Sequence, residues 1–137
     1  MANVQVRYIV HDVEAAVSFY CNHLGFREVM HPSPFFAMLS RDDLRLVLSK
    51  PGGGNGGGSA MANGKLPEPG GWNRFAIEVD NIDTMTSDLR KAGIQFRSEI
   101  ITGVGGKHVI IDDPSGNPVE LFQPSIPEAR LAGHRDG

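Results

Sequence analysis

Apolar positions along the chain follow first a strand period and then a helix period. Residues 4–10 are rich in β-branched side chains and predict a strand. After Asp12, apolar residues recur at i, i+3, i+4, i+7, i+8 and i+11 up to Leu24, which is the spacing of one helix face. Asp12 is a favourable N-cap and Gly25 a favourable stop. The opening of the chain therefore predicts a strand followed by a helix.

The same order of elements occurs twice. In the first half, the helix is followed by strand candidates at residues 26–30, 35–40 and 44–50. The second half begins with a strand at 73–79, a helix between Ile82 and Ala92 that Gly93 ends, and strands at 95–101, 107–112 and 118–123. Both halves thus follow the order β, α, β, β, β. This repetition predicts an internal duplication of a unit of roughly 50 residues.

The duplication predicts an α+β fold of two tandem βαβββ modules. We expect a single domain over residues 1–126, in a chain of 137 residues. Its parts are a first module at 3–50, a Gly-rich crossover loop at 51–71 and a second module at 72–124, and a polar C-terminal tail follows at 127–137.

Composition and charge exclude several classes of protein. No apolar run approaches the ~18 residues needed to span a membrane, and the first residues lack the pattern of a signal peptide. Cys21 is the single cysteine; it excludes an intramolecular disulfide, fits a reducing compartment and is interpreted as a packed helix residue. The net charge of -3 without a basic cluster argues against nucleic acid and membrane partners. We expect a cytoplasmic protein.

The internal repeat allows positions in the two halves to be matched. Aligning the two strand-to-helix junctions, "VHD" and "VDN", places Arg74 opposite Gln5. Aligning the last strands of the two halves, "LVLSKP" and "VELFQP", places Glu120 opposite Val47. These four residues fill the same two positions in each half.

Three features together resemble the vicinal oxygen chelate superfamily over about residues 3–124. They are the repeated βαβββ order, the opening "YIVHDVEAAVSFYCNHLGF" and the ending "DPSGNPVELFQP". The superfamily includes glyoxalases, extradiol dioxygenases, fosfomycin-resistance enzymes and bleomycin-binding proteins. The resemblance implies that each module curls into a half-open barrel, that two modules enclose a cavity and that two chains form a homodimer.

The resemblance also implies where a metal would bind. Metal-using members take their ligands from the positions that are filled here by Gln5, Val47, Arg74 and Glu120. Gln5 and Glu120 offer oxygen atoms, but Val47 offers no lone pair and Arg74 is a permanent cation. We therefore expect no metal cofactor. The alternative is a divalent metal such as Ni, Zn, Mn or Fe held by Gln5 and Glu120, with His108 as a further candidate ligand.

The same positions predict a binding site for a ligand. Arg74 presents a planar fork of donors to a carboxylate, phenolate or carbonyl group, and Glu120 orients it; the alternative is a purely structural ion pair. Glu120 is a weak candidate for a general base, because an adjacent arginine favours its ionised form. His108 is the other weak catalytic candidate, and it lines the cavity only if the hairpin register places it on the face of Glu120.

Apolar residues complete the predicted ligand-binding set. Phe122 shares parity with Glu120 and is expected to face the cavity, where Val47 and Ala76 would add apolar wall. Core filling is the alternative for any single aromatic residue.

The crossover loop admits two interpretations. Its "GGGNGGG" contains a nominal G-x-G-x-x-G, but the breakers that follow it exclude the helix that a nucleotide cradle needs. The loop is either a plain linker or a lid that closes over an apolar ligand with Met61, Leu66 and Trp72.

These features favour a metal-independent protein that binds a small aromatic or amphipathic molecule, as an antibiotic-sequestering resistance protein of the bleomycin type does. The modest charge of -3 argues against a strongly cationic drug as the ligand. The competing hypothesis is an enzyme, namely a divalent-metal-dependent lyase, isomerase or dioxygenase of the glyoxalase type. A third hypothesis is an interaction module whose cavity is degenerate. A non-catalytic binding protein is the main prediction.

Overall fold

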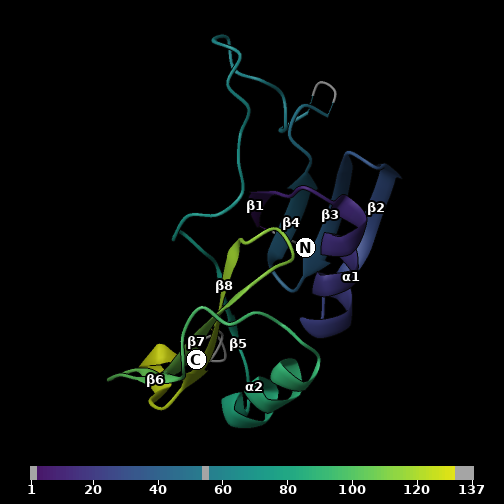
Figure 1. The fold of residues 1–137 in the computed structure, drawn as a ribbon. Coiled ribbons are helices and arrows are strands. Elements are labelled where there is room, and N and C mark those ends of the chain that lie inside the picture. Colours follow the sequence, from purple (N-terminus) through teal and green to yellow (C-terminus); the bar gives the residue numbers. More distant parts are fainter. Residues whose placement is uncertain (1–2, 54–55, 132–137) are drawn as a thin grey trace. The chain divides into compact units, whose positions relative to one another are not determined.

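The computed structural model describes residues 3–53 and 56–131, and they divide into two compact units. The first unit comprises residues 1–71 together with the short segment 113–117. The second unit comprises residues 72–112 and 118–137. Each unit contains strands and a helix in the order β, α, β, β, β, which confirms the predicted α+β duplication (Figure 1).

The first unit is built on a four-stranded mixed sheet that helix α1 covers on one side (Figure 1). The strand order is β1-β4-β3-β2, in which β1 and β4 are parallel and the other neighbours are antiparallel. The elements are β1 (Val4–Ile9), α1 (Val13–His23), β2 (Arg27–Ser33), β3 (Phe36–Arg41) and β4 (Leu44–Ser49). All five predicted elements are present, and β2 extends three residues beyond its expected end.

Helix α1 begins and ends where the sequence signals predict. The Asp12 carboxylate accepts a hydrogen bond from the backbone N–H of Ala15 at 3.0 Å, which satisfies one free donor of the first turn. Gly25 follows the helix with a φ of 74°, a left-handed conformation that glycine adopts readily. Burial, and next the charge of Glu28, raises the pKa of the Cys21 thiol. A raised pKa disfavours the reactive thiolate and agrees with a packed helix residue.

The two faces of this first sheet differ in character. The face toward α1 is apolar and buried, and it is formed by Tyr8, Ala37, Leu39, Leu46 and Leu48. Side chains alternate along a strand, so the intervening residues lie on the opposite face. That opposite face carries Gln5 and Val47 and is more polar and more exposed.

The segment "DPSGN", residues 113–117, is part of the first unit through a buried hydrogen-bond network. The Asp113 carboxylate, 4% exposed, accepts from the Tyr20 hydroxyl at 2.8 Å and from the backbone N–H groups of Ser115 and Asn117 at 2.9 Å. The side-chain amide of Asn117 donates to Asp113 at 3.0 Å and to the backbone carbonyl of Ile9 at 2.8 Å. The motif that carried much of the family resemblance thus has a structural role.

Tyr20 gives this network a dependence on alkaline pH. Burial, reinforced by the nearby Asp113 carboxylate, raises the pKa of Tyr20 well above 10.0. The unfolded chain releases the phenolic proton at a pH of about 10 while the folded chain retains it, so this contribution is complete below that pH and is lost as the pH rises. We expect the free energy of unfolding to fall between about pH 9 and 11, and to fall less in Tyr20→Phe. Urea unfolding across this range tests it, and parallel pH profiles of the two proteins would contradict it.

The second unit repeats the arrangement with shorter outer strands. Its four-stranded sheet has the order β5-β8-β7-β6, with β5 parallel to β8 and the other neighbours antiparallel. The elements are β5 (Ala76–Glu78), α2 (Ile82–Lys91), β6 (Ile101–Thr102), β7 (Gly106–Asp112), β8 (Pro118–Pro124) and a 3₁₀ turn η1 (Pro127–Ala129). Asn81 caps α2 by accepting from the N–H of Thr84 at 3.0 Å, and Gly93 follows it with a φ of 82°.

Two predicted strands of this unit differ from the structure. The strand expected at 73–79 is reduced to β5, so Arg74 lies just before the strand. The strand is shorter because the neighbouring strand β8 begins at Pro118, which has no N–H to extend the ladder. The strand expected at 95–101 is also wrong. There, the N–H groups of Arg97 and Ser98 both donate to the carbonyl of Ile110, and the Ser98 hydroxyl accepts from the N–H of Ile110. This irregular pairing replaces a regular ladder.

The crossover loop follows β4 as a series of turns. The N–H of Gly52 donates to the carbonyl of Gly58 at 2.7 Å, and a Cβ atom at Gly58 would overlap the carbonyl of Lys50. This close approach of two backbone segments explains a glycine at position 58. Residues 54 and 55 of the "GGGNGGG" segment lie outside the described residues. Met61 and Leu66 are 55% and 44% exposed. The choice between linker and lid stays a prediction.

In the described part of the chain, no helix has the length and apolar character needed to cross a membrane. The predicted polar tail begins with the short turn η1, and its residues 132–137 lie outside the described residues.

Candidate functional site

The strand register gives Gln5 and Val47 in the first unit the same relative positions as Arg74 and Glu120 in the second unit. In the first sheet, Val47 is paired with the residue two positions after Gln5. In the second sheet, Glu120 is paired with Ala76, the residue two positions after Arg74. Residues two apart lie on one face of a strand. The alignment derived from the internal repeat is therefore reproduced by the register within each unit.

Arg74 and Glu120 form an ion pair in the second unit. Nε and Nη2 of Arg74 lie 3.0 and 2.9 Å from the same oxygen, Oε1 of Glu120. Nη1 of Arg74 donates to the backbone carbonyl of Trp72 at 3.2 Å. The two charged side chains are 25% and 21% exposed. Three bonds thus orient the guanidinium, and partial burial makes their loss more costly than that of a surface pair.

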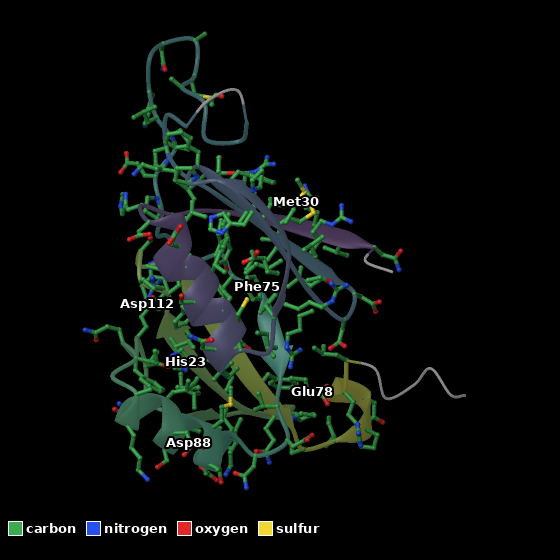
Figure 2. The ribbon with its side chains drawn as sticks, turned by 90° about the vertical axis from the view of Figure 1, so that its right-hand side faces the viewer. His23, Met30, Phe75, Glu78, Asp88 and Asp112 are labelled. Carbon is green, nitrogen blue, oxygen red and sulfur yellow. The ribbon has the colours of Figure 1, made fainter. Side chains whose placement is uncertain are left out.

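A second ion pair lies on the same face of this sheet. Asp112, labelled in Figure 2, stands two positions from Ile110, which is paired with Glu120 in β8. Nε and Nη2 of Arg97 lie 2.9 and 2.8 Å from Oδ1 of Asp112. The Arg97 guanidinium lies 4.6 Å from the ring centroid of Trp72, within cation–π distance.

Trp72 therefore contacts both arginines, one through its backbone carbonyl and the other through its ring. The indole is 67% exposed, so one large aromatic surface beside the ion pairs is available to a ligand. Sequence reasoning missed the Arg97–Asp112 pair, although the shared parity of Asp112 and Glu120 along the hairpin was a usable signal.

The hairpin register answers the question left open for His108. His108 is paired with Phe122, and Ile110 with Glu120, so His108 lies on the face of Glu120. Glu78, labelled in Figure 2, is paired with Phe122 from the other side. The sheet therefore places an imidazole, a phenyl ring and a carboxylate in one row. Their roles in ligand binding or catalysis stay predictions.

Gln5 and Val47 belong to the first unit and are not neighbours in its ladder. Gln5 is exposed and paired with Arg45, whereas Val47 is 1% exposed and paired with Arg7 and Met38. Val47 thus contributes buried apolar surface to this face of the sheet, and Gln5 belongs to the neighbouring row, which is polar.

In the second unit, Arg74 and Glu120 do not fit a divalent metal. Glu120 Oε1 is engaged by Arg74, whose positive charge lies within 3.0 Å of the carboxylate and would repel a cation. Val47 has no donor atom, and Gln5 offers a single neutral oxygen. In the described part of the chain, no group of three or more His, Cys, Asp or Glu side chains is placed to hold a metal ion. The chemistry of these four positions is therefore that of a guanidinium, a carboxylate and an amide.

The fold and the repeated register define a protein of two βαβββ modules that carries polar side chains on the sheet faces away from its helices. The sequence matches the model of the Glyoxalase/Bleomycin resistance protein/Dioxygenase superfamily over residues 4–121, and the chain belongs to that superfamily. No curated protein matches the chain.

Solved structures share this fold. One is a superfamily member from Sphaerobacter thermophilus, with 26% identity, a TM-score of 0.69 and coverage of 90% of this chain and 98% of that one. Lactoylglutathione lyase from Agrobacterium tumefaciens has 23% identity and a TM-score of 0.68, with 89% and 92% covered. The antibiotic-binding protein TnmS3 from Streptomyces sp. CB03234 has 23% identity and a TM-score of 0.68, with 91% and 98% covered. A lyase and a binding protein are thus equally similar in fold, and function must be argued from the site.

Proposed function

We propose that this chain is a metal-independent binding protein for a small aromatic or amphipathic molecule, with antibiotic sequestration as a candidate role. The observation that carries the proposal is the Arg74–Glu120 ion pair. It stands at two positions where the family resemblance implies metal ligands. Oriented by Glu120 and by the carbonyl of Trp72, the fork of Arg74 is prepared to receive an acceptor group of a ligand.

The residues around the pair support a flat ligand with both polar and apolar parts. Ala76 is exposed beside Glu120, and Phe122 is partly exposed two positions further along the same strand. The indole of Trp72 adds an accessible ring. Aromatic surface beside an arginine suits a molecule with a π system and an oxygen acceptor. TnmS3, which has a similar fold, is named as an antibiotic-binding protein, and this supports a binding role for the fold.

Catalysis has less support at this site. Oε1 of Glu120 accepts two hydrogen bonds from Arg74, so only Oε2 remains for a proton that a base would take. His108 is the remaining acid–base candidate, paired with Phe122 rather than with Glu120. The homodimer and the cytoplasmic location stay predictions.

A ligand panel with matched variants tests the proposal. We expect a few aromatic or amphipathic compounds, antibiotics included, to raise the melting temperature, because a ligand at about 100 times its Kd adds about 2.7 kcal/mol of stability. Arg74→Met should abolish the shift given by these compounds. Asp83→Asn is the control and should leave the shift unchanged. Asp83 of α2 pairs with Lys107 at 3.3 Å, on the sheet face opposite to Arg74 and Glu120.

Two outcomes would contradict the proposal. One is stoichiometric Ni, Zn, Mn or Fe in protein purified without chelator, lost together with ligand binding in Glu120→Ala, which would favour a metal-dependent enzyme. The other is a panel without any stabilising compound, which would favour an interaction module.

A further inference from the structure

A row of polar side chains crosses the whole first sheet on the face opposite α1. In the strand order β1-β4-β3-β2, the paired residues of this row are Gln5, Arg45, Ser40 and Arg27. Directly paired residues on neighbouring strands share a face, so these four side chains project from the same side. Ser40 stands between two arginines.

The next row on this face is mostly apolar. It begins with Arg7 at β1 and continues with Val47, Met38 and Met30, the last of which is labelled in Figure 2. Val47 is 1% exposed and Met30 is 44% exposed. The face thus presents a polar strip beside an apolar strip that is accessible at its β2 end.

The polar strip borders a hollow of ≈ 560 Å³ in the first unit. Its lining includes Arg27, Ser40, Arg41, Asp42 and Arg45. This volume lies within the range of about 300–1,000 Å³ that is usual for small-molecule sites. The hollow therefore offers room for a ligand beside the row.

The arginines of the hollow differ in their hydrogen-bond and ion-pair partners. Arg41 donates from Nε to the carbonyl of Leu24 at 2.9 Å and pairs with Asp42 at 3.4 Å. In the described part of the chain, the side chains of Arg27 and Arg45 have no hydrogen bond or ion pair with a protein group. Three arginines against one aspartate give the hollow a local excess of positive charge, although the whole chain carries -3. Arg27 and Arg45 retain their full set of donors for a ligand.

We propose that this hollow binds the oxyanion head of a small amphipathic anion, a carboxylate or a phosphate, between Arg27 and Arg45 and over the hydroxyl of Ser40. Neighbouring strands are about 4.8 Å apart, so the two arginines start about 10 Å apart across β3, and their long side chains converge on a group between them. Guanidinium forks and a hydroxyl are the donors that oxyanions prefer. Val29, which also lines the hollow and is 44% exposed, offers apolar surface to the tail of the ligand.

This inference is independent of the Arg74–Glu120 pair, because all the residues that carry it belong to the first unit. An inorganic anion can test it even if the compound panel yields no ligand. Failure at one site therefore does not decide the other.

The test is an NMR titration of the full chain with inorganic phosphate, acetate and octanoate at constant ionic strength. We expect saturable amide shifts gathered at residues 25–30 and 40–46, with octanoate bound more tightly than acetate because its chain covers apolar surface. Arg27→Met and Arg45→Met should each weaken binding by about fivefold or more, since each removes a charge-assisted partner.

Two further variants show whether charge in the hollow determines binding. Asp42→Asn should tighten binding by about threefold, because it removes a negative charge near the oxyanion. Asparagine tolerates the left-handed conformation of this position, where φ is 51°. Arg90→Met, which removes an exposed arginine of the second unit, should leave binding unchanged.

Non-saturating shifts spread over the surface would overturn the site. So would equal affinities of Arg27→Met, Arg45→Met and the unchanged protein. Equal affinities for octanoate and acetate would overturn the apolar part of the proposal.

Discussion

Asp113→Ala is expected to lower the free energy of unfolding by about 3–5 kcal/mol, the largest stability effect that we predict for one side chain. The Asp113 carboxylate is 4% exposed and accepts hydrogen bonds from Tyr20, Ser115 and Asn117. Alanine leaves buried donors without acceptors, and an unsatisfied buried donor costs more than a hydrogen bond contributes. Urea unfolding at neutral pH measures the change.

Asp80→Ala is the matched control for this substitution. Asp80 is an exposed aspartate of the second unit, and a solvated surface position changes stability by less than about 0.5 kcal/mol. Equal effects of the two substitutions would show that the Asp113 network does not stabilise the fold.

A double-mutant cycle at Arg74 and Glu120 is expected to show strong coupling. Arg74→Met alone leaves a partly buried carboxylate unpaired, and Glu120→Leu alone leaves a partly buried guanidinium; each should cost about 1–3 kcal/mol. The double variant should cost less than the sum by about 1–2 kcal/mol, because no unpaired charge remains. Chemical unfolding of the four proteins measures the coupling energy.

The same four proteins separate a ligand-binding pair from a purely structural pair. If Arg74 receives a ligand, the double variant regains stability and still fails to bind the compounds found with the panel. Retained binding by the double variant would assign the pair to the structure alone. Additive stability losses would contradict a coupled ion pair in solution.

Local sequence signals located the elements of this chain well. Asp12 caps the first helix as predicted, and Gly25 and Gly93 follow the two helices in left-handed conformations. These signals involve residues within one turn of each other, so they can be interpreted without the rest of the fold. The strand at 95–101 was wrong because Ser98 uses its side chain where a regular strand would use its backbone, and periodicity does not detect this exchange.

Locating the candidate site required both the sequence and the structure. The internal duplication matched Arg74 to Gln5 and Glu120 to Val47 as equivalent positions. The strand register within each sheet reproduces this equivalence. The family resemblance implied that the positions of Arg74 and Glu120 adjoin, so the ion pair could be anticipated as a hypothesis. Its geometry, with two guanidinium nitrogens on one carboxylate oxygen, required the structure.

The amino-acid sequence by itself determined the duplicated α+β architecture, because periodicity is a local property. It also shows a valine and an arginine, Val47 and Arg74, at two positions where the family resemblance implies metal ligands, and the expected loss of those ligands stays a prediction. Tertiary structure alone decided which distant polar residues meet. Arg27, Ser40 and Arg45 form one row only through the registers of β2, β3 and β4, and a shift of one residue would turn a side chain to the other face. Register depends on bulges and turn geometry along whole strands, so the anion-binding row became visible only in the fold.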